Sequence, residues 1–173
     1  MNIRRLSPSD AAVFRALRLA ALLETPEAFV ASHEEEKDQP ISFFEDRLVA
    51  RPGHAVFGAF IDGTLAAVAG LTRADAMQLA HKCNLWGMVV AAPARGQGVA
   101  RQLLQAVLDH ARATPGVAKV TLSVDSANVA AIALYESLGF VVFAREADAV
   151  RLHGRSRDDL QMHLRFSAPD PAA

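Results

Sequence analysis

Residues 85–111 constrain the fold most, because they combine a strand, a glycine-rich turn and an amphipathic helix. Leu85 to Val90 is a continuous apolar run, as expected of a central strand that is covered on both faces. Pro93 to Gly98 forms a loop, and apolar residues then recur at helical spacing from Val99 to Ala111. A buried strand that turns directly into such a helix predicts a sheet with helices packed on it.

The rest of the chain predicts one mixed sheet. Asp62-Gly63 joins two apolar stretches and is a hairpin turn of the kind that needs positive φ angles. In chain order, we expect a strand at 3–6, helices at 8–23, 27–37 and 41–50, strands at 54–61, 64–71 and 85–90, a helix at 99–111, a strand at 117–124, a helix at 128–138, and strands at 140–144 and 160–166. Residues 72–81 fit a loop or a strand extension. The predicted class is α/β (α+β in some schemes), with helices on both faces and one domain over residues 1–166, followed by a disordered tail over 167–173.

Composition narrows the classes of partner. The 173 residues suit one domain, and 18 Lys and Arg against 19 Asp and Glu give a net charge of -1. Such a balance provides no basic field, so we expect neither nucleic acid nor a membrane as partner. The single cysteine, Cys83, excludes an intrachain disulfide and fits a reducing compartment, hence a cytoplasmic location. No signal peptide and no metal-binding spacing are recognised.

The loop after the apolar strand is the strongest candidate for a binding site. Arg95-Gly96-Gln97-Gly98-Val99-Ala100 stands where a helix begins, and unpaired N–H groups and the helix dipole favour an anion there. Alternatively, the glycines only make a tight turn. A dinucleotide fingerprint needs a third glycine where Arg101 stands, and the Gly-Lys-Ser/Thr of a P-loop is absent.

Two segments resemble the GNAT superfamily of N-acetyltransferases. Arg95-x-x-Gly98-x-Ala100 resembles the family's acetyl-CoA pyrophosphate loop, Gln/Arg-x-x-Gly-x-Gly/Ala. Asn128 to Phe140 resembles its Asn-x-x-Ala-x-x-Leu-Tyr-x-x-x-Gly-Phe stretch, and the order of elements matches over about residues 2–166. One departure is Pro93, which stands one place later than in the family and lacks the following Glu. The resemblance implies a single-domain GNAT-like fold, whose mostly antiparallel sheet of six to seven strands has splayed central strands.

The resemblance also implies roles for individual residues. Backbone amides of the loop would hold the pyrophosphate, the strand ending at Val90 would pair with the pantetheine arm, Asn128 would hydrogen-bond the pantetheine or a water near it, and Tyr135 would face the thioester sulfur. The implied acetyl-CoA-binding residues are Met88, Val89, Val90, Arg95, Gly96, Gln97, Gly98, Val99, Ala100, Arg101, Asn128 and Tyr135. Tyr135 and Asn128 are the candidate catalytic residues, and no metal is implied.

Acetyl transfer to an amine needs a neutral amine, a polarised carbonyl and a proton for the leaving thiolate. A phenol with a pKa of about 10 can supply that proton, although Tyr135 could instead be a packed helix residue. A backbone N–H of Val89 or Val90 would polarise the carbonyl. The candidate bases are His33, Glu34, Glu35 and Glu36, but for any single acid a solvated face is the simpler interpretation, and a water chain could take the proton.

The sequence gives fewer indications of which residues bind the acceptor amine. Phe29, His33, Glu34 and Trp86 are the candidate substrate residues, although Trp86 could equally belong to the core. The run of acids would suit a cationic amine. The predicted function is acetyl transfer from acetyl-CoA to a primary amine of a small molecule, peptide or protein by direct attack in a ternary complex. The alternatives are an acyl-CoA-binding regulatory module without turnover and a transferase for a longer acyl group. The strands of 140–166 suggest a homodimer.

Overall fold

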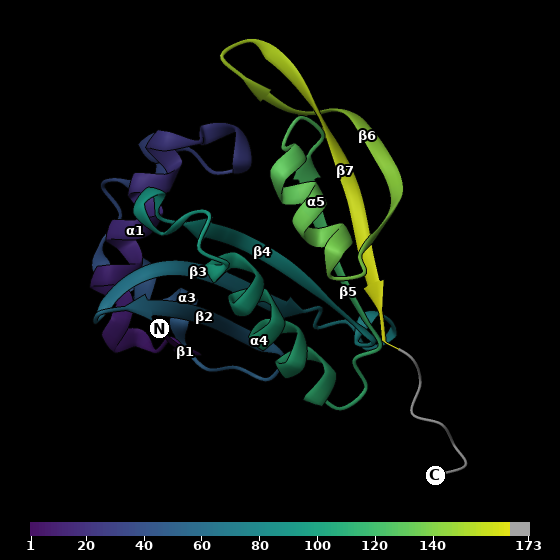
Figure 1. Ribbon diagram of the computed structural model, residues 1–173, viewed down its shortest axis with the longest axis horizontal. Coiled ribbons are helices and arrows are strands. Elements are labelled where there is room, and N and C mark those ends of the chain that lie inside the picture. Colours follow the sequence, from purple (N-terminus) through teal and green to yellow (C-terminus); the bar gives the residue numbers. More distant parts are fainter. Residues whose placement is uncertain (167–173) are drawn as a thin grey trace.

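One seven-stranded sheet organises the molecule. The computed structural model describes residues 1–166, and the tail predicted at 167–173 lies outside the described residues. The strand order is β1-β2-β3-β4-β5-β7-β6, and every neighbouring pair is antiparallel except β4 and β5, which are parallel. The mixed, mostly antiparallel sheet confirms the predicted fold class (Figure 1).

The elements follow one another along the chain as the predicted order requires. The strands are β1 Asn2–Arg5, β2 His54–Ile61, β3 Thr64–Arg73, β4 Lys82–Val90, β5 Lys119–Asp125, β6 Val141–Leu152 and β7 Arg155–Arg165. The helices are α1 Ala11–Glu24, α2 His33–Glu36, α3 Ile41–Leu48, α4 Val99–Ala113 and α5 Val129–Ser137.

Local sequence accounts for the sharpest of these boundaries. In the β2–β3 turn, Asp62 and Gly63 have φ angles of 49° and 79°, the positive values of a type I′ hairpin. The side chain of Asn128 caps α5 by accepting a hydrogen bond from the Ala131 N–H at 3.1 Å. The same helix ends at Ser137 and is followed by Gly139, whose φ of 93° suits a residue without a β-carbon.

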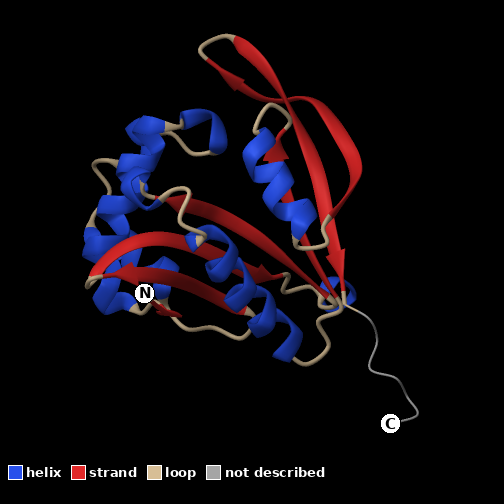
Figure 2. Ribbon diagram, viewed as in Figure 1, coloured by secondary structure: helices blue, strands red, loops and turns tan. Residues whose placement is uncertain are grey.

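Helices cover both faces of the sheet, as predicted (Figure 2). Helices α1 and α3 pack on one face, where Phe14, Phe44 and Val68 are buried in one cluster. Helix α4 packs on the other face, where Leu103 and Leu104 belong to a second cluster that also receives Tyr135 of α5. The two layers fix the positions of the helix ends that surround the central strands.

The central strands β4 and β5 separate after a short paired stretch. Their registered pairs are Lys82 with Lys119, Cys83 with Val120, and Asn84 with Thr121. Beyond Asn84 the strands diverge, so the later part of β4 has no strand on that side (Figure 1). The splay is the one that the resemblance implies. The β3–β4 register shifts near Gly87, whose φ is 62°, and such bulges often adjoin functional sites.

Two expectations from the sequence are wrong in extent. The helix predicted at 27–37 is a short turn at Pro26–Ala28 followed by the single-turn helix α2, because Ser32 caps that turn and starts the helix only at His33. The strands predicted at 140–144 and 160–166 are much longer, since β6 and β7 form a continuous hairpin around His153 and Gly154. Within residues 1–166, no helix is long and apolar enough to cross a bilayer.

Candidate active site

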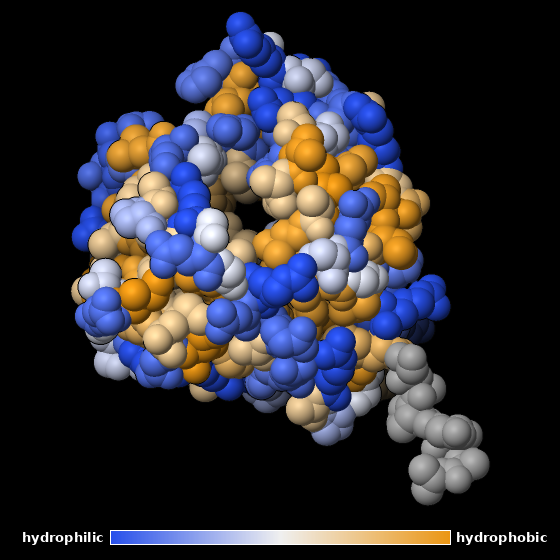
Figure 3. Space-filling model, in the orientation of Figure 1, coloured by the Kyte–Doolittle hydropathy of each residue, from blue (hydrophilic) through white to orange (hydrophobic). Residues whose placement is uncertain are grey.

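A cleft opens where β4 and β5 separate. Its volume is about 710 Å³, and Figure 3 shows the molecule hollowed between α5 and the α1–α2 region. The walls come from the end of α1, the turn after it, the edge of β4, the glycine loop, the start of α4, and α5. Of the predicted site residues, the cleft gathers Phe29, Met88, Val89, Val90, Arg95, Gly96, Gly98, Val99, Ala100, Arg101, Asn128 and Tyr135.

The glycine loop presents bare backbone to this cleft. Gly96 and Gly98 have φ angles of 74° and 76°, and a β-carbon added to Gly96 would have no atom within 4 Å. The first bond of α4 runs from the Gln102 N–H to the Gly98 carbonyl at 3.2 Å. The preceding N–H groups of Val99, Ala100 and Arg101 therefore have no partner inside the helix. This end of α4 can bind an anion.

Side chains around the loop hold its shape. The Arg95 Nε donates to the Val90 carbonyl at 3.0 Å, and its two terminal nitrogens bind the Glu24 carboxylate at 2.9 and 2.6 Å. Gln97 folds back and donates to the Pro93 carbonyl at 2.7 Å, outside the cleft wall. The Arg101 Nη2 donates to Ser137 Oγ at 2.7 Å and ties α4 to α5. Arg95 thus lines the cleft while its guanidinium braces the loop.

The free edge of β4 faces the cleft. The Ala91 N–H donates to the Ala66 carbonyl of β3 at 2.8 Å, whereas the Val90 carbonyl accepts from Arg95. Because successive residues of a strand alternate in the direction of their backbone groups, Met88 and Val90 turn theirs toward the side that β5 has left. Val89 turns toward β3. Of the two predicted carbonyl polarisers, Val90 has its N–H on the cleft side.

Tyr135 lies at the meeting point of the cleft walls. Its side chain packs edge-on against Phe140, with ring centroids 5.7 Å apart, and the residue is 7% exposed. Burial raises the pKa of Tyr135 to about 12. No group within residues 1–166 hydrogen-bonds its hydroxyl, so the proton of this phenol is available to a ligand at neutral pH.

The turn before α5 is held by an ion pair that the sequence did not suggest. Asp125 is buried at the end of β5, accepts from the Ala127 N–H at 2.7 Å, and pairs with Arg157 of β7. Arg157 lines the cleft beside Asn128. The pair fixes the turn that presents Asn128, whose side-chain oxygen is occupied by the cap of α5. The one signal in the sequence was an acid three residues before Asn128.

A narrow cavity of about 160 Å³ continues the cleft between the diverging strands. It shares Met88, Asn128 and Tyr135 with the cleft and extends to Trp86 and Ser123. Trp86 also lines a third cavity of about 670 Å³ on the α2–α3 side. Its Nε1 donates to Thr72 Oγ1 at 2.8 Å, and its ring stacks on His54. Trp86 therefore combines packing with a place in the cavity wall.

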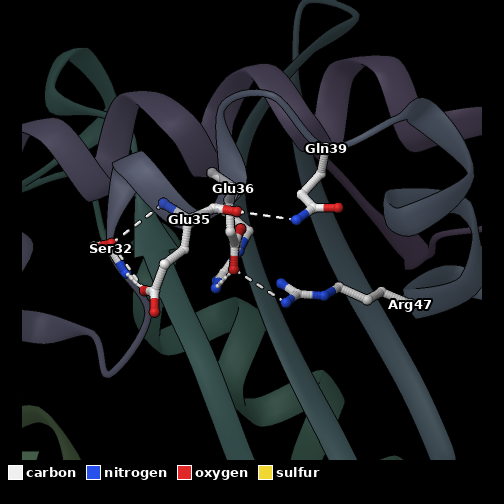
Figure 4. Close-up of polar contacts among 6 residues, drawn as sticks. Ser32, Glu35, Glu36, Gln39 and Arg47 are labelled. Atoms are coloured by element: carbon white, nitrogen blue, oxygen red, sulfur yellow. Dashed lines mark hydrogen bonds and ion pairs between the residues drawn. The ribbon is translucent and has the colours of Figure 1, made fainter.

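The predicted acids separate into different environments. Glu34 is an exposed surface residue that pairs with Lys37, and neither it nor His33 belongs to the walls of the three cavities. Glu35 closes the cap of α2, since its carboxylate accepts from the Ser32 N–H at 2.7 Å (Figure 4). Glu36 is buried and its carboxylate is bound by arginines.

Those arginines are Arg18 of α1 and Arg47 of α3. The Arg18 Nε and Nη2 bind the two Glu36 oxygens at 2.5 and 2.6 Å, and the Arg47 Nη2 binds Glu36 at 3.0 Å. Sequence reasoning missed this cluster, because its members come from three helices with no fixed spacing. The cluster also withdraws Glu36 from the expected acidic surface, since its carboxylate is bound by two arginines.

Comparison with known sequences agrees with this geometry. A model of the acetyltransferase (GNAT) family matches residues 17–140. The chain is 32% identical over 120 residues to the ribosomal protein bS18-alanine N-acetyltransferase of Escherichia coli strain K12. That match covers 68% of this chain and 77% of the relative.

Solved structures of acetyltransferases superpose on this chain. The structure of yncA, a putative acetyltransferase from Salmonella typhimurium with its cofactor acetyl-CoA, superposes with a TM-score of 0.82 at 26% identity and covers 99% of both chains. A GNAT-family acetyltransferase from Streptococcus pneumoniae superposes with a TM-score of 0.84 at 23% identity, over 95% of this chain and 99% of that one. The second likeness concerns the fold alone.

Proposed function

Because this chain belongs to the GNAT family of acetyltransferases, we propose that it moves an acetyl group from acetyl-CoA to a primary amine. The amine belongs to a small molecule, a peptide or a protein, and it attacks the thioester directly while both substrates are bound. The observation that carries the proposal is the cleft itself: one glycine loop, one free strand edge and one unengaged phenol meet there.

Two features of the cleft support binding of acetyl-CoA. The loop offers the unpartnered N–H groups of Val99, Ala100 and Arg101 together with the positive end of the α4 dipole, which suits a pyrophosphate. The edge of β4 offers the backbone groups of Met88 and Val90 to an amide-containing arm. The cleft volume of about 710 Å³ lies within the range of small-molecule sites. Acetyl-CoA supplies the activated acetyl group.

Residues of the chain would then carry the transfer. The Val90 N–H donates a hydrogen bond to the acetyl carbonyl oxygen as negative charge develops there. The Tyr135 hydroxyl donates its proton to the departing thiolate, and its pKa of about 12 keeps that proton in place until a strong base forms beside it. Asn128 offers its amide nitrogen to the bound arm. Holding both reactants in one cleft supplies much of the rate.

The amine must lose a proton before or during attack. His33 and Glu34 lie away from the cavities, and the carboxylates of Glu35 and Glu36 are held by other groups. None of the four candidate bases is therefore free in the cavity walls, and we assign the proton to water, one of the routes that the sequence left open, or to the carboxylate of Glu27, which lines both the cleft and the narrow cavity.

Transfer of label tests this proposal. The protein is incubated with acetyl-CoA labelled in the acetyl group and with a panel of primary amines, amino acids and peptides, and both labelled amide and free thiol are measured. Label in an amide, with one thiol released for each, is the expected result. Binding of acetyl-CoA without transfer to any acceptor would instead support the regulatory module. Tighter competition by longer acyl-CoAs would support the alternative acyl group.

Two further expectations belong to the same proposal. The edge strand β6 exposes Val141, Val142 and Phe143, and Figure 3 shows apolar surface over β6 and α5, so we expect two copies to assemble there. Light scattering that gives the mass of one chain would refute the dimer.

We also expect a cytoplasmic location, since the buried thiol of Cys83 is unpaired.

A further inference from the structure

The cavity on the α2–α3 side adjoins the proposed reaction centre. Its volume is about 670 Å³, and it shares Phe29, Trp86 and Gly87 with the narrow cavity that reaches Met88 and Tyr135. An acceptor lying in it would approach the thioester from the side opposite the glycine loop. The chemistry of this cavity therefore bears on which amine the enzyme takes.

Two guanidinium groups share one carboxylate in its wall. Arg18 and Glu36 are buried, with side chains 8% and 3% exposed, while the side chain of Arg47 is 27% exposed. Within residues 1–166, the Nη1 atoms of Arg18 and Arg47 are engaged in no hydrogen bond. Since guanidinium stays charged in proteins, this cluster carries one positive charge more than Glu36 can balance.

Arg47 lies within the influence of the Arg18 charge, although burial has the larger effect on its pKa. Burial lowers the pKa of Arg47, and the neighbouring charge of Arg18 lowers it further, while Glu36 opposes both effects. The other carboxylate in the cavity wall belongs to Glu35, which bends back to Ser32 and accepts from its N–H and its hydroxyl (Figure 4). An anion would meet two partly unoccupied donors at the Arg18–Arg47 end.

The position of Arg18 sets the distance between that anion and the amine. Its Nη1 lies 3.9 Å from the place that a β-carbon on Gly87 would take, and Gly87 directly precedes Met88 on the free edge of β4. A group bound to Arg18 is therefore close to the acetyl group that this edge would hold. The remaining wall includes three aromatic side chains, Phe29, Phe43 and Trp86.

We infer that the acceptor is a free amino acid with an apolar side chain, whose carboxylate binds the unengaged Nη1 groups of Arg18 and Arg47. The inference rests on the proposed acetyltransferase function and specifies its substrate class. Guanidinium binds carboxylate through charge-assisted hydrogen bonds, often in pairs. The α-amine is then directed to Met88, and the side chain packs on the aromatic wall. A peptide N-terminus has an uncharged amide in place of this carboxylate and leaves the arginines without a ligand.

The reaction balances without a further reactant. The amine nitrogen forms a bond to the acetyl carbon, the carbon–sulfur bond breaks, and its electron pair passes to sulfur. The thiolate takes the proton of Tyr135, which is restored from solvent, and the proton of the amine passes to water or to the Glu27 carboxylate. The products are an N-acetyl amino acid and CoA.

Three matched acceptors test the inference: L-phenylalanine, L-phenylalaninamide and 2-phenylethylamine. They share the side chain and the amine, and only the first has a carboxylate. We expect kcat/KM for the acid to exceed that of either analogue without a carboxylate by about tenfold or more. The ammonium group of the amide is more acidic than that of the acid, so a larger fraction of the amide is present as the neutral amine. Intrinsic reactivity alone would therefore favour the amide, which is the opposite of the expected result. Equal use of the three, or preference for the amide, overturns the inference and leaves the proposed function intact. Transfer to none of them by a protein that acetylates another amine of the panel also overturns the inference alone, and only failure with the whole panel overturns the proposed function.

Substitutions of Arg47 test whether this residue causes the preference for an acceptor with a carboxylate. Arg47→Gln should raise KM for L-phenylalanine by about tenfold, with kcat/KM for 2-phenylethylamine within about twofold of wild type. Arg47→Lys should recover part of the loss, because it restores the charge but not the planar donor pair. Arg112→Gln, at an arginine paired with Asp109 on the outside of α4, is the matched control and should leave all values unchanged. Equal losses for both acceptors in Arg47→Gln would overturn the assignment to the carboxylate.

Discussion

Replacing Glu36 with glutamine should destabilise the fold far more than a single neutralised charge on the surface would. The residue is 2% exposed, and its carboxylate accepts three hydrogen bonds at 2.5, 2.6 and 3.0 Å. In Glu36→Gln, the side chain keeps its size, but the new NH₂ group points donors at guanidinium donors. Arg18, itself 7% exposed, is left as a buried cation without a counter-ion.

The magnitude follows from this burial. Removal of one partner of a buried ion pair costs about 3–5 kcal/mol, because the other charge stays desolvated. Partial exposure of Arg47 and the retained amide oxygen argue for the lower end of that range. For a domain of this size, each kcal/mol lowers Tm by about 2–4 °C, so a loss of about 3 kcal/mol corresponds to a fall of about 6–12 °C.

Thermal and urea unfolding followed by circular dichroism measure this loss. The matched control is Glu24→Gln, which removes the same charge from an ion pair with Arg95 whose side chains are 43% and 46% exposed. Exposed pairs contribute little, since water and salt screen them, so this variant should unfold close to wild type. A Glu36→Gln variant that unfolds together with Glu24→Gln would refute the reasoning.

The pH dependence provides a second measurement of the same ion pair. Burial tends to raise the pKa of Glu36, but the hydrogen bonds and charges of Arg18 and Arg47 outweigh it, so the pKa is lowered. A carboxylate with a lowered pKa stabilises the fold above its unfolded pKa and loses that contribution as pH falls through the folded pKa. The difference in stability between wild type and Glu36→Gln should therefore narrow in acid. A difference independent of pH would count against the ion pair as its source.

Three shorter predictions concern the cleft. Gly98→Asp should weaken acetyl-CoA binding by more than tenfold, about 1.4 kcal/mol or more, because it places a negative charge at the N-terminus of α4, and calorimetric titration measures this. Tyr135→Phe should lower kcat by on the order of 10²–10⁴ with unchanged acetyl-CoA affinity, unless amine attack limits the rate. Since Tyr135 has a pKa of about 12, kcat should show no loss of the acid between pH 7 and 10; a fall there would argue for another donor.

The elements that the sequence predicted well are those that are determined by residues close together in the chain. The Asp62-Gly63 turn, the apolar stripe of α4 and the cap of α5 at Asn128 each depend on residues within a few positions of one another. The glycine loop belongs to the same class, since its φ angles and its place before α4 follow from the order of residues 95–100. Local sequence therefore suffices to position the proposed acetyl-CoA side of the cleft.

The full length of the β6–β7 hairpin was missed because little of it is buried. Most of β6 is exposed, so no buried apolar stripe marks its length, and its contacts with β7 include an exposed ion pair of Arg145 with Asp158 at 2.8 Å. The acceptor side was missed for a different reason. Arg18, Glu36 and Arg47 meet only through the packing of α1, α2 and α3, and no spacing along the chain predicts three-body contacts between helices. Glu36 looked like one of three surface acids.

Direct attack in a ternary complex predicts that the single cysteine takes no part in transfer. Cys83 is 1% exposed, pairs with Val120 where β4 and β5 are still joined, and lies outside the walls of the three cavities described above. Burial raises the pKa of its thiol, so little thiolate forms at neutral pH. Cys83→Ala should therefore keep kcat within about twofold of wild type. Intact-mass measurement after incubation with acetyl-CoA alone should find no acetylated protein. An acetyl group on Cys83 that later passes to the amine would refute direct attack, because the cysteine would then be the nucleophile of a two-step transfer.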